Sequence, residues 1–501
     1  MGRPCSDRYP GKSRLCIVAC LLLPGVVSAT TWHVTYDPAQ PEDRVGAVAA
    51  LAASGDSILI DPGTYYEHIP LEGKSLTFIG IDGAGVTILD GSRALPDREG
   101  SIIYTLTGAP ADLTICGLTL QNGTGTPYPE ITYYEATAGG GILWWERNVG
   151  FSASLVVTDC VLRDNTTGAP WEGDPYQGGG IFAGSLESVD VLRSEFSGNL
   201  SDGGGSDIQI AATRATVAEC SFQVADGNSY GASCIGQSVG QLLRIERCVF
   251  LAEQGDGQHK SIRASPINVE IVDNRFLDIN GPLATCVWVV CDFCAEPLPQ
   301  DVLISGNVFW NAAGPDSTAE PTVLIGADGA VPVLRNNTFD RCGIEISTTM
   351  FGGPLVFEGN LVARGQVRSD VPRGGDYSCN DFWRSRVTDY AGNLTHANNI
   401  TDNPFFCDEA GGGFTLSEGS PCAPSGSCDL IGAEPVACDL DIHACCVGQE
   451  CVLATEEECS DLGGHWMIDP PLTSCEPDPC LTPARKTTWG AMKALFRGDA
   501  K

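Results

Sequence analysis

The sequence predicts an all-β protein: a right-handed single-stranded parallel β-helix (solenoid) with a small disulfide-rich C-terminal module. Three observations predict this fold. A short pattern returns every 23 to 34 residues, helical spacing is almost absent between its copies, and six cysteines cluster near the C-terminus. A period in the twenties to thirties with short β-rich units is typical of a solenoid of β-coils.

The recurring pattern is a polar residue, then Asn or Cys, then any residue, then Phe or Leu, and it follows a short apolar strand. Strands this short cannot bury a core alone, so each must pair with the equivalent strand of the next coil around one interior. The apolar anchors of the pattern are Leu162, Phe196, Phe222, Phe250, Phe276, Phe309, Phe339 and Val362.

The Asn or Cys position of the pattern predicts a second stacked row. Amide side chains at one coil position can bond along the stack as a ladder, and small buried side chains can take the same place. The residues at this position are Cys160, Cys220 and Cys248, followed along the chain by Asn274, Asn307, Asn337 and Asn360.

The start of the solenoid is also readable. Residues 41–53 can form a short amphipathic helix that covers the open end of the first coil, where an exposed strand edge would favour aggregation. Strands are expected after it at 57–60, 66–70, 75–80 and 86–89, and Gly63 and Gly73 are expected in the turns between them.

Residues 1–29 have the pattern of a secretory signal peptide. Four basic residues precede an apolar run at 15–27, and a small residue, Ala29, stands at the expected cleavage site. We therefore expect a secreted, extracellular or cell-surface protein. The formal net charge of −34 excludes nucleic acid as a partner, because phosphates require cationic surfaces.

Two further segments follow the predicted β-helix of 30–440. Residues 441–482 are too short for a self-sufficient core, so disulfides must stabilise them, and fifteen pairings are open. Residues 483–501 form a basic amphipathic tail that can engage a sorting machinery or a membrane surface. The cysteines of the 441–482 module are Cys445, Cys446, Cys451, Cys459, Cys475 and Cys480.

Cys286, Cys291 and Cys294 allow two interpretations, a zinc site or disulfides. Cys291 and Cys294 form a C-x-x-C pair, but no second pair follows at zinc-ribbon spacing. Disulfides are the better expectation in an oxidising compartment.

Several stretches resemble secreted bacterial right-handed parallel β-helix repeat proteins. Residues 62–91 are similar to the opening coils of the pectin-esterase and NosD-like type. The GGGI motifs at 139–142 and 178–181, with FSGN at 196–199, resemble the GGxI and FxxN repeats of polymorphic outer-membrane proteins. The motifs at 377–438 resemble closing coils, and 441–482 resembles a Cys-rich module of secreted bacterial proteins. The resemblance implies the fold more firmly than the function.

The catalytic signatures of such enzymes are not found. The Asn-Thr-Asp and Gly-His-Gly motifs of polygalacturonases are absent, and no esterase constellation can be placed. The nearest lyase candidate combines Glu253 and Asp256 with His259, Lys260 and Arg263, and a solvated loop is the simpler interpretation. A polysaccharide lyase or glycoside hydrolase stays as the alternative, and a structural envelope component as a further one.

The long insertion at 124–177 is the candidate ligand site. Aromatic faces stack on sugar rings and carboxylates accept hydrogen bonds from hydroxyl groups, and calcium could bridge an acidic ligand to such carboxylates. We expect non-catalytic, adhesin-like binding of a polysaccharide or cell-surface glycan. If residues 144 and 145 lie in a strand, one of the two tryptophans belongs to the core. The candidate residues are Tyr133, Tyr134, Trp144, Trp145, Glu146, Trp171, Glu172 and Asp174.

Overall fold

The computed structural model describes residues 29–480, apart from short segments. Residues 1–28 and the C-terminal tail at 483–501 lie outside it. The chain divides into two compact units, Met1–Thr401 with Gly426–Ala433, and Asp402–Ser425 with Glu434–Lys501. The segments left out between 29 and 480 are 72, 94, 96–99, 106–110, 128–136, 146–151, 169–177, 202–204, 225–232, 253–259, 266–267, 280–284, 291–299, 312–320, 327–328, 349–351, 410–411, 425, 441, 449, 468–474 and 476–479.

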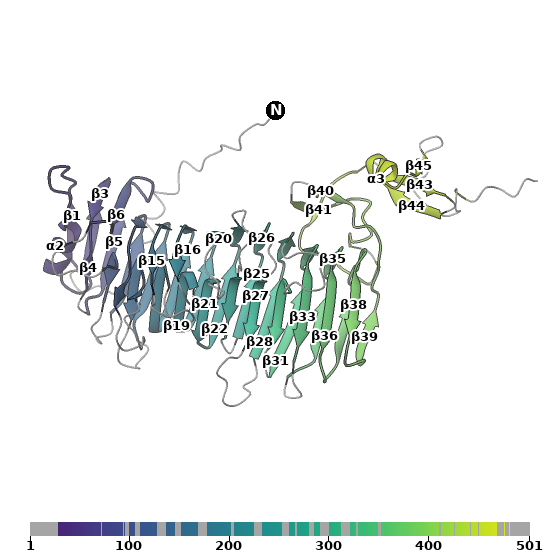
Figure 1. The fold of residues 1–501 in the computed structure, drawn as a ribbon, viewed down its shortest axis with the longest axis horizontal. Helices are drawn as coiled ribbons and strands as arrows, with labels where there is room; N and C mark the ends of the chain where they lie inside the picture. The colour runs from purple at the N-terminus through teal and green to yellow at the C-terminus, as the bar shows by residue number, and fades with distance from the viewer. Residues whose placement is uncertain are drawn as a thin grey trace, which may run out of the picture. The chain divides into compact units, whose positions relative to one another are not determined.

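The first unit is the predicted parallel β-helix, with strands stacked in three columns around one interior (Figure 1). The first column contains β1 (Thr31–Val34), β2 (Ser57–Ile60), β5 (Leu76–Gly80), β8 (Leu113–Cys116), β13 (Ser154–Thr158), β22 (Leu242–Glu246), β25 (Asn268–Val272), β28 (Gln300–Ser305), β31 (Ala330–Arg335), β34 (Leu355–Glu358), β37 (Gly375–Ser378) and β39 (Leu394–Ala397).

The second column forms a sheet of its own. It contains β3 (Gly63–Tyr66), β6 (Thr87–Asp90), β9 (Thr119–Gln121), β14 (Val161–Arg163), β17 (Glu195–Ser197), β20 (Ser221–Val224), β23 (Val249–Ala252), β26 (Arg275–Leu277), β29 (Val308–Trp310), β32 (Thr338–Asp340) and β35 (Leu361–Ala363).

The third column is joined to the first by two long strands, β16 (Ile181–Leu192) and β19 (Gly205–Ala218). The first half of β16 pairs with the third column and its second half with the first, across an irregularity at Gly184/Leu186. The other strands of the third column are β4 (Ile69–Pro70), β7 (Ile103–Tyr104), β12 (Ile142–Trp145), β21 (Ser233–Val239), β24 (Lys260–Ala264), β27 (Thr285–Val290), β30 (Val323–Gly326), β33 (Gly343–Ser347), β36 (Gln366–Asp370) and β38 (Arg386–Asp389).

Two short pairs accompany the columns. β10 (Thr126–Pro127) pairs antiparallel with β11 (Thr137–Ala138), and β15 (Thr166–Thr167) pairs parallel with β18 (Leu200–Ser201).

The apolar anchors of the repeat stack inside the second column, as predicted. From Phe196 to Phe339 the six phenylalanines pair in register, with neighbouring ring centroids 4.6 to 4.9 Å apart and planes within 12° of parallel. Leu162 and Val362 continue the row at its two ends. Stacked coils about 4.8 Å apart allow this arrangement without strain.

The predicted polar ladder is also confirmed. Asn307 donates from Nδ2 to Asn337 Oδ1 at 3.0 Å and accepts from Asn274 Nδ2 at 3.0 Å, and its neighbours repeat the pattern. The Cys248 backbone N–H donates to Asn274 Oδ1 at 2.8 Å, which joins the cysteine part of the row to the amide part. The row also includes Ser194, whose copy of the pattern, Ser194 to Phe196, fits more loosely, and two residues that the sequence analysis left out, Asn380 and Asn399.

Replacing one ladder amide should weaken the fold strongly. Asn307→Ala removes five hydrogen bonds and leaves buried backbone groups unsatisfied, so we expect a loss of about 3 kcal/mol or more in the free energy of unfolding. Urea unfolding measures it. The control is Asn311→Gly in the same coil, which loses one part-buried hydrogen bond at a left-handed position. Equal effects of the two substitutions would contradict the ladder's importance.

A helix covers the first coil, as predicted. α2 (Arg44–Leu51) lies at the N-terminal end of the solenoid (Figure 1), and Val45 and Ala49 are buried in the core. The side chain of Asp43, the residue before α2, makes no capping hydrogen bond to the helix. Instead Glu67, which is buried between β3 and β4, accepts hydrogen bonds from the backbone N–H groups of Val45 (2.7 Å) and Gly46 (3.1 Å).

The Glu67 carboxyl should make the stability of this end depend on pH. Burial raises the pKa of Glu67 to about 7, although the two backbone hydrogen bonds oppose the rise. A raised pKa in the folded state gives stability below about pH 4.5 that is lost as the pH rises through about 7. Glu67→Gln should therefore gain stability relative to the parent chain between pH 5 and pH 8, by on the order of 2 kcal/mol in unfolding measurements. A difference that stays constant with pH would contradict this.

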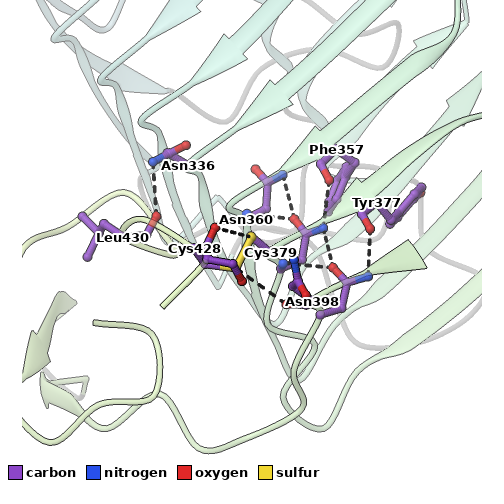
Figure 2. Close-up of a disulfide and its surroundings, with 11 residues drawn as sticks. Asn336, Phe357, Asn360, Tyr377, Cys379, Asn398, Cys428 and Leu430 are labelled. Atoms are coloured by element: carbon purple, nitrogen blue, oxygen red, sulfur yellow. Dashed lines mark hydrogen bonds between the residues drawn. A yellow bond between two sulfur atoms is a disulfide. The ribbon is translucent and has the colours of Figure 1, made fainter. Parts of the chain in front are cut away.

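A short segment returns to the first unit from further along the chain (Figure 2). Cys428 forms a disulfide with Cys379, beside the end of the amide ladder. Three hydrogen bonds attach the same segment to the preceding coils: Asn336 Nδ2 to the Leu430 carbonyl (3.3 Å), Gly432 N to the Gly359 carbonyl (2.7 Å) and Ala433 N to Thr338 Oγ1 (2.9 Å).

The second unit contains two small sheets. β40 (Phe406–Asp408), β41 (Gly413–Ser417) and β42 (Val436–Cys438) form the first, which a disulfide between Cys407 and Cys438 crosslinks. The last described strand of the columns is β39, and the strands described between 402 and 440 form this small sheet. β43 (His443–Val447), β44 (Glu450–Ala454) and β45 (His465–Trp466) form the second sheet, next to α3 (Glu456–Asp461).

All six predicted cysteines of the C-terminal module are paired. The disulfides are Cys445–Cys459, Cys446–Cys480 and Cys451–Cys475. Disulfides of this number are typical of an oxidising, extracellular environment. In the part of the chain that the structure describes, no helix is long and apolar enough to span a membrane.

One disulfide expectation is wrong. Cys286 is a free thiol buried in the core, since it lies at the start of β27 with its side chain among interior residues. Cys291 and Cys294 lie outside the described residues.

Candidate functional site

The two adjacent tryptophans of β12 point in opposite directions, as a strand requires. Trp144 is 1% exposed, belongs to the interior core with Ile142, and donates from Nε1 to the Ala111 carbonyl at 3.2 Å. It therefore offers no face to a ligand, and its place among the candidate binding residues is corrected. Trp145 is directed outward and stays partly exposed.

Trp145 rests on a second apolar cluster, which lies on the outer side of the third column. Tyr104, Leu143 and Phe182 occupy one register position on β7, β12 and β16, and with Ala138 they are at most 5% exposed. Outward side chains of a solenoid normally meet solvent, so a buried aromatic cluster here is a local exception. It gives Trp145 a rigid apolar support.

A glycine makes room for this arrangement. Gly184 pairs with Trp145 in the β12–β16 register. A Cβ atom added to Gly184 would lie 2.8 Å from Trp145 Cδ1 and 2.9 Å from Phe182 Cε1. Both rings therefore lie directly against the backbone at this position, which any side chain would push away.

The same outward row continues along the third column toward a second tryptophan. Phe182 aligns with Gln209, then with Gly236, Arg263 and Trp288 on the following strands. The Arg263 guanidinium carbon lies 5.1 Å from the Trp288 ring centroid, within the range of a cation–π contact. We call Tyr104, Leu143, Trp145, Phe182, Arg263 and Trp288 the aromatic face.

The aromatic face combines the features that sugar recognition uses. Trp145 and Trp288 are partly exposed, and each has one side supported by neighbouring groups. A supported ring loses little entropy on stacking against a pyranose, and the Arg263 guanidinium can donate hydrogen bonds to hydroxyl or carboxylate oxygens.

The other predicted ligand residues cannot be placed on this face, because they lie outside the described residues. They are Tyr133, Tyr134, Glu146, Trp171, Glu172 and Asp174. The same holds for Glu253, Asp256 and His259 of the lyase candidate, whose remaining members Lys260 and Arg263 are in β24.

The calcium expectation receives no support from the described residues. Among them, no group of three or more His, Cys, Asp or Glu side chains is arranged to hold a metal ion.

Sequence reasoning missed Tyr104, Leu143, Phe182 and Trp288. A signal was available for two of them. The GGGI motifs at 139–142 and 178–181 stack in register, and in each the residue after Ile points outward. Aligning the motifs places Leu143 beside Phe182 and shows an apolar pair where the outward side should be polar.

Neither the profiles of known protein families nor the curated protein sequences match this chain.

The packing of the Trp145 ring against Gly184 can be tested without a ligand. Gly184→Ala places a methyl group against two rings in a packed cluster, which should destabilise the chain by about 1 to 3 kcal/mol and lower its thermal unfolding midpoint. Gly85→Ala is the control, because an added Cβ there meets nothing within 4 Å. An unchanged midpoint in Gly184→Ala would mean that the rings move aside freely.

Proposed function

We propose that this chain is a secreted or cell-surface protein that binds glycan without catalysis, in the manner of an adhesin. The observation that carries the proposal is the partly exposed Trp145 on a buried, outward-facing aromatic cluster. The rings of Trp145 and Trp288 are large apolar groups that stay partly exposed on the outside of the solenoid, and a binding role accounts for that exposure.

The environment of the protein supports the same proposal. Five disulfides among the described residues fit an extracellular location, and the expected signal peptide fits export. A solenoid of stacked coils is a rigid platform, on which the two partly exposed rings can meet an extended polymer.

Ring removal tests the proposal. Trp145→Ala and Trp288→Ala should each weaken binding to the best glycan of an array about tenfold, because one stacking contact is worth on the order of 1 kcal/mol. Trp310→Ala is the matched control, since Trp310 is a partly exposed tryptophan of the second column. Binding can be measured by calorimetry on the full chain.

The alternatives give different results in the same experiment. New reducing ends or unsaturated sugar products would replace the proposal with a hydrolase or a lyase. Equal binding by all three variants would remove the aromatic face as the site. No glycan binding, together with tight attachment to cells, would favour a structural envelope component.

A further inference from the structure

Three arginines stack at one corner of the last coils. Arg341, Arg364 and Arg384 each follow a strand or bridge of the second column, and backbone hydrogen bonds fix their register: Arg341 N to the Ala363 carbonyl and Arg364 N to the Trp383 carbonyl, both at 2.9 Å. Their φ angles are 55°, 54° and 52°, in the left-handed region. Asp278 and Asn311 occupy the same corner position in the two preceding coils.

The backbone at this corner does not favour arginine. Left-handed positions favour Gly, Asn or Asp, and other residues adopt them at a cost in free energy. The two earlier coils follow that preference. The last three place a long cation there instead, so the corner becomes basic in a chain whose formal net charge is −34.

The arginines at this corner differ in their surroundings. Arg364 forms an ion pair with Asp340, a side chain that is 0% exposed, and Arg341 lies 3.9 Å from the same carboxylate. The Arg341 side chain is 46% exposed, and Arg384 is exposed as well. Arg386, also exposed, follows two residues later at the start of β38. We call Arg341, Arg364, Arg384 and Arg386 the basic corner.

A buried tryptophan holds two of the guanidinium groups in place. Trp383 is 8% exposed, and its ring centroid lies 4.8 Å from the Arg384 guanidinium carbon and 5.2 Å from that of Arg364. Contacts of this kind orient the planar groups before a ligand arrives, which lowers the entropy lost on binding.

We propose that the basic corner binds the anionic groups of an acidic polysaccharide. Guanidinium groups bind carboxylate and sulfate oxygens in a bidentate way, and successive coils present them at intervals of about 4.8 Å along the solenoid. The basic corner spans few coils. The rest of the chain is acidic and repels polyanions that come within the screening length of about 8 Å. A short stretch of charged sugar fits these limits better than a nucleic acid, which needs an extended basic surface. The inference does not require the aromatic face to bind anything.

Three dextrans with one backbone provide the test: carboxymethyl dextran, dextran sulfate and neutral dextran. The full chain should bind one or both charged forms at low salt and not the neutral form, and the affinity should fall steeply with added salt. The relative affinities of the two charged forms tell whether carboxylate or sulfate is preferred. A single-stranded DNA oligonucleotide is the fourth arm.

The double variant Arg384→Ala with Arg386→Ala should bind the charged dextran at least about tenfold more weakly. Its control is Arg214→Ala with Arg335→Ala, which removes the same charge from side chains 65% and 50% exposed elsewhere. Thermal unfolding checks that both remain folded. Equal losses in the two variants, no binding of charged dextran by the parent chain, or preferential binding of DNA would each overturn the proposal. None of these outcomes tests the aromatic face, which is probed by Trp145→Ala.

Discussion

The fold depends on one constraint, that each coil must lie on the next in a single register. The polar ladder imposes it, because every buried amide finds its partners one coil away. Asn307, for example, can satisfy its side chain only if Asn274 and Asn337 lie directly before and after it. The residue before each ladder position turns through a left-handed conformation, at Asp273 and Asn336 among others. Two or more hydrogen bonds of about 1 kcal/mol each offset the cost of that turn.

Register gives the outer surface its order. Residues at the same position of successive coils lie side by side on the outer surface. Like or complementary side chains at that position therefore form a row. The aromatic face uses a row of the third column, from Tyr104 to Trp288, and the basic corner uses the turn after the second column. Both surfaces follow from the same stacking, and they differ in their position on the coil and in the residues that occupy it.

The sequence predicts the interior far better than the outer surface. Phe196 to Phe339 are readable because an inward row must be apolar and each copy carries the same signal. Asn380 belongs to a copy of the same pattern, Cys379 to Phe382, so the sequence carries the same signal there. The direction of Trp144 and Trp145 is a different matter, since two adjacent aromatic residues fit either phase of a strand. Only the pairing of β12 with β16 decides which one faces the core.

The cysteines show why counting residues does not predict their chemistry. An oxidising environment suggests disulfides throughout, yet Cys160, Cys220 and Cys248 are free and buried in the polar ladder. The Cys220 backbone N–H donates to Cys248 Sγ at 3.5 Å, so the thiol takes the accepting role that an amide oxygen has in later coils. Burial raises the pKa of Cys160 to about 12, which keeps the thiolate, the reactive form, scarce. These thiols lie in the interior of the solenoid, where burial keeps soluble oxidants away from them.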